Sequence, residues 1–186
     1  MRKVLLSPER LPPSLTGLGD LVAERLPDSS VESIAEISSH TITGDNPALI
    51  VVTDLVIERG VPLEGLINDV TNVAETTPAD LIFVTGDGYL GTDGPHLKQA
   101  AAGAAMIALA RSLATRRERR ARSNVVCVPD LMFGNEGSQA SPLPQPVEAV
   151  DVAATIAYLL DDSGLYLSGQ VIYVDGGRHL FSSHTA

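Results

Sequence analysis

The feature that most constrains the fold of this chain is a series of short apolar runs, each followed by a longer segment of helical periodicity. The runs at residues 2–7 (RKVLLS), 48–55 (ALIVVTDL) and 79–86 (ADLIFVTG) are apolar over most of their length and do not alternate with polar residues. Strands of this kind are buried on both faces, which is typical of parallel sheets. The sequence therefore predicts an α/β fold, with helices on both faces of a doubly wound parallel sheet.

The remaining segments follow the same alternation and predict a single domain over residues 1–186. Strands are expected within 30–40, at 123–130 and at 169–177, and helices at 16–26, 62–77, 96–122 and 145–162. Pro146 is expected in the first turn of the last helix, a position that tolerates proline.

Composition and charge argue against several classes of function. The formal net charge of −10 argues against a protein that binds nucleic-acid phosphates through a basic surface. No apolar run approaches the ~20 residues needed to cross a bilayer, and the N-terminal apolar stretch is too short for a signal peptide. The single cysteine, Cys127, excludes an internal disulfide and a multi-cysteine metal site. We therefore expect a cytoplasmic protein without a metal, a membrane contact or a nucleic-acid partner.

The C-terminal part of the chain, about residues 103–181, resembles the short-chain dehydrogenase/reductase family. The matching text is GAAMIALARSLA, then NVVCVPD, then PVEAVDVAATIAYLLDDSGLYLSGQVIYVDGG, in the order and spacing of that family. In style it is similar to the 3-oxoacyl carrier-protein reductases. The resemblance implies an abbreviated Rossmann-like domain, in which the nucleotide-binding half, about residues 1–60, is shortened.

The family binds the pyrophosphate of NAD(P) with a Thr-Gly-x-x-x-Gly-x-Gly turn after the first strand. Here Gly17 and Gly19 match the last two glycines, but the first falls at Pro13. Proline has no N–H to offer a phosphate and stiffens the turn. We therefore expect no cofactor, with Gly17 and Gly19 as vestiges. NAD(P) would enter only if this vestigial site works or through a partner subunit.

The resemblance also implies an acidic or basic residue that binds the adenosine ribose after the second strand, and Glu36 is the candidate. The stretch between that strand and the run at 48–55 is too short for the helix–strand–helix unit of the family, since a parallel crossover needs about a dozen residues or more. One strand of the sheet, together with the adenine pocket beside it, is therefore expected to be missing.

The catalytic residues of the family have no equivalents at the matching positions. The serine that orients the substrate carbonyl falls at Thr85 or Gly86. The Tyr-x-x-x-Lys pair, in which tyrosine donates the proton and lysine lowers its pKa, falls at Gln99 and Gly103. Glutamine has no titratable proton and glycine has no side chain, so we expect no catalytic residue of the family kind.

Other residues near this position are candidates for a different reaction. The candidates for a reaction without nicotinamide are Thr85, Asp87, Tyr89 and His96, and Asp87, Asp93 and His96 would form a small polar cluster. Thr85 is also a common kind of strand-end cap, and His96 a common kind of helix cap. Tyr89 and Lys98 are separated by a GTDGP turn, so they cannot stand one helical turn apart.

The assembly surfaces of the family are the part that this sequence keeps. In the family, two helices form a four-helix bundle across a two-fold axis, and the last helix and strand form a second interface. The positions expected at these interfaces are Ala101, Ala104, Ala105, Ala108, Arg111, Tyr173 and Arg178. Helix propensity alone is the alternative explanation of the alanines.

A basic run from Arg116 to Arg122 stands out in an acidic chain. The run TRRERRAR and Arg111 together contain six of the thirteen basic residues. Cations that complement the end of a helix are one explanation, and a docking patch for an acidic carrier protein or the phosphates of acyl-CoA is the other.

Three functions follow from these observations. The favoured one is a non-catalytic subunit that assembles with an active short-chain dehydrogenase/reductase paralogue, in a heterodimer or heterotetramer. The others are an enzyme of altered chemistry near Thr85–His96, and an NAD(P)-dependent oxidoreductase with a noncanonical motif.

Overall fold

The structure is a computed structural model, and it describes residues 2–11, 15–26, 28–37, 42–87, 97–116, 121–129, 142–143 and 145–180. Within these ranges six strands form one sheet in the order β2-β1-β3-β4-β5-β6, and every neighbouring pair is parallel. The strands are β1 (Arg2–Ser7), β2 (Ser29–Ser33), β3 (Ala48–Val52), β4 (Asp80–Thr85), β5 (Ser123–Cys127) and β6 (Val171–Tyr173). The predicted parallel α/β sheet is confirmed.

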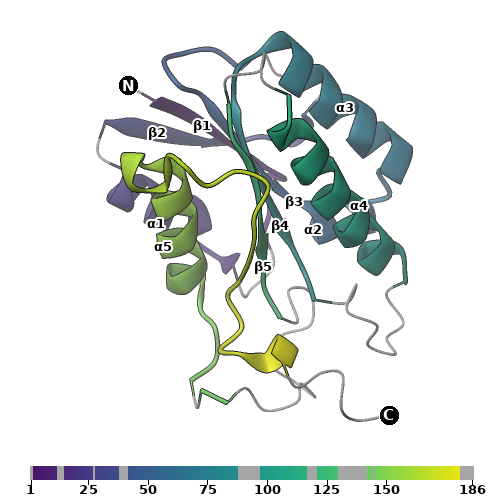
Figure 1. Cartoon of the computed structure of the whole chain (residues 1–186), viewed down its shortest axis with the longest axis vertical. Coiled ribbons are helices and arrows are strands. Elements are labelled where there is room, and N and C mark those ends of the chain that lie inside the picture. The colour runs from purple at the N-terminus through teal and green to yellow at the C-terminus, as the bar shows by residue number, and fades with distance from the viewer. Residues whose placement is uncertain are drawn as a thin grey trace.

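Helices cover both faces of this sheet, as Figure 1 shows. The helices α1 (Leu18–Arg25) and α5 (Ala149–Leu160) lie on one face, and α3 (Leu63–Thr76) and α4 (Leu97–Ala114) lie on the other. The short helix α2 (Thr53–Glu58) lies beside α4. Two 3₁₀ turns, η4 (Asp162–Gly164) and η5 (Arg178–Leu180), follow α5 and β6.

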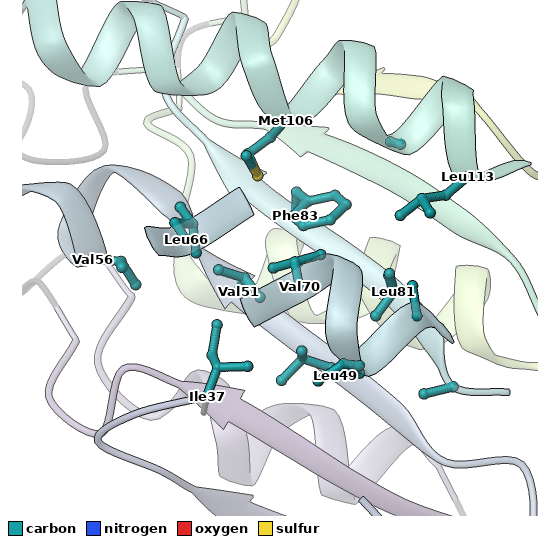
Figure 2. Packing of buried hydrophobic residues seen from close by; sticks show 14 of the residues in the cluster. Ile37, Leu49, Val51, Val56, Leu66, Val70, Leu81, Phe83, Met106 and Leu113 are labelled. Atoms are coloured by element: carbon teal, nitrogen blue, oxygen red, sulfur yellow. The ribbon is translucent and has the colours of Figure 1, made fainter. Parts of the chain in front are cut away.

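The sheet separates two hydrophobic clusters, because successive side chains of a strand point to opposite faces. Leu6 and Ile50 pack toward α1 and α5, whereas Leu49 and Phe83 pack toward α3 and α4. Figure 2 shows the second cluster, with Phe83 against Met106 of α4. β3, β4 and β5 are buried over their whole length. Their continuous apolar runs are therefore explained by burial on both faces.

Several elements end earlier than the sequence predicts. The run at 48–55 is a strand only to Val52, and Thr53 begins α2. The helix predicted over 96–122 ends at Ala114, before the arginines. The helix predicted over 145–162 begins at Ala149, so Pro146 lies outside its first turn. There the Asp151 carboxylate accepts a hydrogen bond from the N–H of Glu148, and this cap fixes the start.

The described residues of the connection from β2 to β3 contain no helix. The Ile34 N–H bonds to the Leu6 carbonyl at 2.8 Å, and Ile34, Ile37 and Ile42 are buried in the cluster under α3. Three isoleucines thus cover the area where a crossover helix would pack. Among the described residues, β2 is the outermost strand at this side of the sheet.

Because all strands are parallel, their carboxyl ends meet at one edge of the sheet, here called the carboxyl edge. Their N-terminal ends meet at the opposite amino edge. In open α/β sheets ligands bind outside the carboxyl ends of the strands. The candidate site is therefore sought at the carboxyl edge.

Candidate functional site

A buried carboxylate, Asp54, lies at the centre of the carboxyl edge. It stands in the first turn of α2, directly after β3, and only 6% of its surface is exposed. The Thr85 hydroxyl donates a hydrogen bond to Asp54 Oδ1 at 2.8 Å, and the Gly86 N–H donates to Asp54 Oδ2 at 3.0 Å. Both donors come from the end of β4. Asp54 therefore ties the ends of two neighbouring strands together, and its acceptors are used inside the protein.

Gly103 packs directly on Thr85. A Cβ atom at position 103 would stand 2.5 Å from Thr85 Oγ1, closer than side chains approach in proteins. The two positions that the resemblance gives to the catalytic serine and lysine are therefore in direct contact. Gln99 lies one turn earlier on α4 and is half-buried. The space beside Thr85 is thus occupied by backbone at the position where a lysine is expected.

The end of β4 is also bound to the strands on its other side. The Cys127 thiol, fully buried at the end of β5, donates to the Gly86 carbonyl at 3.5 Å. Asp87 Oδ2 lies 3.7 Å from Arg178 Nε, and both side chains are about nine-tenths buried. Arg178 follows β6, so this ion pair links the last segment of the chain to β4. The expected interface residue Arg178 therefore has its charge compensated within the chain.

An aspartate–histidine pair follows β6. Asp175 is buried, and its Oδ2 lies 2.7 Å from His179 Nδ1 and accepts from the His179 N–H at the same distance. The rings of Tyr173 and His179 stack, with centroids 3.9 Å apart. Such a pair can orient an imidazole for proton transfer. Its contacts hold the turn after β6.

The altered chemistry predicted near Thr85–His96 is only partly described. Tyr89, Asp93 and His96 lie outside the described residues. Of the predicted set, Thr85 bonds to Asp54 and Asp87 pairs with Arg178.

The start of α1 keeps one feature of a dinucleotide site. Gly17 caps the helix with φ of +76°, and a Cβ there would meet nothing within 4 Å. Gly19 lies against Leu6 and Val31, where a Cβ would make ordinary contacts at 3.5 Å. Pro8 and the fully buried Leu15 belong to the stretch between β1 and Gly17. A proline and an inserted leucine do not fit the tight glycine turn that brings N–H groups to a pyrophosphate.

Glu36 lies toward α3. Burial raises the pKa of Asp69 in α3, and the nearby Glu36 carboxylate raises it further. Glu36 stands three residues beyond the end of β2. Its neighbourhood is therefore a helix surface, in the region where the sheet of the family would continue.

One face of α4 is exposed and consists of small apolar residues. Ala101, Ala104 and Ala108 are exposed at helical spacing, and Ala105 is half-buried beside them. Leu97, on the same stripe, is 78% exposed. The other face of α4 is buried against the sheet. A helix that is apolar on both faces is typical of one that packs on two sides.

The basic run divides into two parts. Arg122 is partly buried and pairs with Asp80 at 2.6 Å, and it also bonds to the Leu160 carbonyl. Arg116 is exposed and pairs with Glu75 at 3.2 Å. Residues 117–120 lie outside the described residues. Arg122 is thus a structural residue of the amino edge.

Neither a membrane-spanning helix nor a metal site is found in the part of the chain that the structure describes. None of its helices has the length and apolar character needed to cross a bilayer. No group of three or more histidine, cysteine, aspartate or glutamate side chains is placed to hold a metal ion there.

Sequence reasoning missed Asp54, Asp175 and His179. Asp54 was expected within a strand, although a Thr-Asp pair after an apolar run is a usual sign of a helix start. Asp175 lies within the strand predicted at 169–177. A hydrogen bond between two residues four positions apart in a turn leaves no periodic pattern in the sequence.

Comparison with known proteins agrees with this architecture. A family model described as enoyl-(acyl carrier protein) reductase matches residues 74–179, more than half of the chain. No curated protein matches in sequence.

Solved structures with the same fold cover nearly the whole chain. The 3-alpha-hydroxysteroid dehydrogenase from Pseudomonas sp. B-0831, complexed with NADH, is 17% identical with a TM-score of 0.65, covering 100% of both chains. A short-chain type dehydrogenase/reductase from Mycobacterium ulcerans is 17% identical with a TM-score of 0.66, covering 98% of this chain and 93% of its own. A small-chain dehydrogenase in complex with NADPH is 18% identical with a TM-score of 0.64, covering 97% and 99%. At these identities the likeness establishes the fold alone.

Proposed function

Because the chain belongs to the short-chain dehydrogenase/reductase family, we propose that it is a non-catalytic subunit that assembles with an active reductase of the same family. The observation that carries this proposal is the closure of the carboxyl edge. Thr85 and Gly86 both donate hydrogen bonds to the Asp54 carboxylate at the position where the family presents its serine hydroxyl. Thr85 is 1% exposed, so its hydroxyl is not available to a substrate.

The neighbouring helix supports the same conclusion. Proton transfer to a carbonyl needs an acid whose pKa is tuned by a nearby cation. Gln99 cannot supply the proton, and Gly103 leaves no room for a lysine because Thr85 fills the space. The chain thus keeps the frame of the family without the pair that performs its chemistry.

Assembly through α4 is the function that this frame still supports. The exposed alanines allow a partner helix to approach closely, and Leu97 would be buried by it. The partner we propose is an active paralogue, in a heterodimer or heterotetramer in the cytoplasm. The chain would stabilise that partner or shape its substrate pocket.

No cofactor is expected in this chain under the proposal. When bound in a member of the family, NAD(P)H supplies the hydride. Here Pro13, which lies outside the described residues, takes the place of the first glycine of the phosphate-binding turn, so NAD(P) would be held by the active partner. The complexes with NADH and NADPH are those of the similar proteins.

A second candidate function is an NAD(P)-dependent oxidoreductase with an altered motif. The left-handed conformation of Gly17 at the start of α1, with open space around it, is the observation that favours it. Fluorescence titration of the purified chain with NADH and NADPH separates the candidates. We expect no saturable change, and saturable binding by the chain alone would favour the oxidoreductase.

Co-expression with a reductase of the same family from the same organism tests the assembly. We expect a complex in size-exclusion chromatography, and a reductase that is more stable or more active than alone. Ala104→Glu should abolish the complex because it places a charge on the apolar face of α4. Ala35→Glu, at an exposed alanine between β2 and β3, is the matched control. A monomer that binds no such reductase would refute the proposal.

A further inference from the structure

The outer side of β2 carries backbone groups that point away from the rest of the sheet. β2 is the outermost strand on its side among the described residues, as Figure 1 shows. The Ile34 N–H, one residue beyond the strand, donates to the Leu6 carbonyl of β1. Successive residues of a strand direct their backbone groups to opposite sides, so the N–H and C=O groups of Val31 and Ser33 point away from β1. Such a row of groups is a template on which another strand can pair.

The sequence of β2 lacks the features that usually protect an exposed edge strand. Edge strands commonly carry a proline, a bulge or an uncompensated charge, each of which discourages pairing with another strand. β2 reads SSVES, and its register with β1 is continuous over the whole strand. Its one charged side chain, Glu32, forms an ion pair with Lys3 of β1 at 3.0 Å. We therefore expect the outer side of β2 to be paired in the assembled protein.

We propose that the strand that pairs here is β2 of a second copy of this chain, antiparallel to the first about a two-fold axis at Val31. Two-fold axes are the commonest symmetry of homo-oligomers. In this register Val31 of each copy lies opposite Val31 of the other, and the two residues exchange hydrogen bonds. The Ser33 N–H of each copy donates to the Ser29 carbonyl of the other. The Ser29 N–H already bonds to the Leu26 carbonyl at 3.2 Å, so the ladder ends there with its donor satisfied.

The side chains of β2 are complementary to themselves in this pairing. On one face of the sheet, Val31 is partly buried against the hydrophobic cluster under α1 and α5, and Val31 of the second copy would cover its exposed part. On the other face, Glu32 lies opposite the Ser30 hydroxyl of the second copy, so no two like charges are directly opposed. Each Glu32 is compensated by Lys3 of its own chain. A second copy therefore fits this side of β2 without an unfavourable contact.

The outer side of β2 lies apart from the surface proposed for the reductase. α4 packs on β4 and β5, and β1 and β3 separate these strands from β2. A dimer through β2 therefore leaves α4 of each copy exposed. Such a dimer would hold two reductase subunits in a heterotetramer, and this arrangement, unlike the dimer itself, rests on the proposed function.

Analytical ultracentrifugation of the purified chain over a range of protein and salt concentrations tests the dimer. We expect a monomer–dimer equilibrium that salt shifts toward the dimer, because two copies of net charge −10 repel each other. Hydrogen exchange supplies the position of the contact. The Val31 and Ser33 amides should exchange more slowly as the protein concentration rises, whereas the Ser30 and Glu32 amides, which point to β1, should change little.

A charge at position 30 tests the register of the pairing. Ser30→Glu places a carboxylate opposite Glu32 of the second copy, twice in the symmetric ladder, and should weaken the dimer at least about tenfold. Ser30→Lys places a cation there and should strengthen it. Ser112→Glu and Ser112→Lys, at an exposed serine of α4, are the matched controls and should leave the dimer unchanged. Circular dichroism and the urea midpoint of each variant check that the chain remains folded.

A chain that stays monomeric at every concentration would overturn the inference, and so would similar effects of Ser30→Glu and Ser30→Lys. Loss of self-association in Ala104→Glu would place the contact between copies on α4 and would overturn it as well.

The co-expression test with the reductase, repeated with Ser30→Glu, separates the dimer from the proposed function. We expect the reductase complex to form, since α4 is unchanged in this variant. Its loss would place the reductase on β2 and refute the dimer. A dimer of the unmodified chain without any reductase complex would refute the proposed function alone, and a reductase complex without a dimer would refute the dimer alone.

Discussion

A side chain at position 103 would have to share its space with Thr85. The Cβ of Gly103→Ala would come to 2.5 Å from Thr85 Oγ1, so α4 or the end of β4 must move. We expect the variant to lose about 1–3 kcal/mol of unfolding free energy, as overpacked cores do. Urea denaturation measures the loss. Gly65→Ala is the control, because its nearest neighbours lie at 3.9 Å, and it should gain about 0.5–1 kcal/mol. Equal stability of Gly103→Ala and the unmodified chain would contradict the packing.

The pKa of the exposed Asp161 carboxylate depends most on one hydroxyl group. The Ser163 hydroxyl, which donates to Asp161 Oδ2 at 2.9 Å, lowers the pKa of Asp161. Ser163→Ala should therefore raise that pKa, and carboxyl NMR titration measures the change. A carboxylate whose pKa is depressed by folding contributes stability above its unfolded pKa and loses it as the pH falls through the folded pKa. The stability difference between the two proteins should accordingly shrink in acid. An unchanged Asp161 pKa in the variant would show that backbone groups cause the shift.

The residues of the site were predictable only where they fill a motif. Thr85, Gln99 and Gly103 were placed by their spacing along one strand and one helix. The bonds of Asp54 to β4 and of Asp87 to the turn after β6 join segments that are distant in the sequence. No local pattern specifies such bonds, because they depend on how the strands are ordered in the sheet.

Among the elements, α2 depends most on a single polar residue. Asp54 holds this six-residue helix against β4 by accepting from Thr85 and Gly86. Asp54→Ala would leave both buried donors without this acceptor, at about 1–3 kcal/mol for each. The measurement is hydrogen exchange of the α2 and β4 amides together with the denaturation midpoint. Glu58→Ala, at an exposed position of the same helix, should change stability by less than about 0.5 kcal/mol. Similar effects of both variants would mean that α2 is held by its apolar contacts alone.

The elements themselves were predicted well where burial alone decides them. β1 and the central strands follow from continuous apolar runs, and α3 from its periodicity. Boundaries were missed where polar residues decide them, as at Thr53 and at Glu148. The helix predicted over 96–122 ends at Ala114 in the structure. The prediction ran too long because helical propensity continues through the arginines, and propensity alone does not fix where a helix ends.

Across the whole molecule, the polar groups at the two edges of the sheet are arranged differently. At the carboxyl edge, the hydrogen bonds of Asp54 and the Asp87–Arg178 pair join the segments at the ends of three strands, β3, β4 and β6. At the amino edge, the basic end of α4 and the turn after α5 leave Arg116 and Tyr166 exposed. The Thr85 hydroxyl, which the resemblance places at the catalytic serine, bonds to Asp54 within the protein. Under the proposed function, such a chain would work through a neighbouring subunit.

The amino edge is held by one carboxylate that joins three strands and a helix. Asp80 of β4 accepts from Arg122 at 2.6 Å and from Arg2 of β1 at 3.3 Å, and both guanidinium groups also bond to the last carbonyl of α5 at Leu160. Asp80→Asn removes the negative charge that both guanidinium groups share and leaves two cations close together in a largely buried place. We expect a loss of about 3–5 kcal/mol in unfolding free energy, as when a buried pair is broken from one side.

Denaturation of Asp80→Asn should be compared with Glu75→Gln, which removes the exposed partner of Arg116 and should cost no more than about 1 kcal/mol. Because Arg2 lies in the first strand and Arg122 before the fifth, Asp80→Asn should also lower the protection of β1 and β5 amides together. Loss of protection in β4 alone would show that each strand is held independently. Loss in all three, together with an intact carboxyl edge, would show that one buried charge unites the N-terminal and C-terminal halves of the sheet.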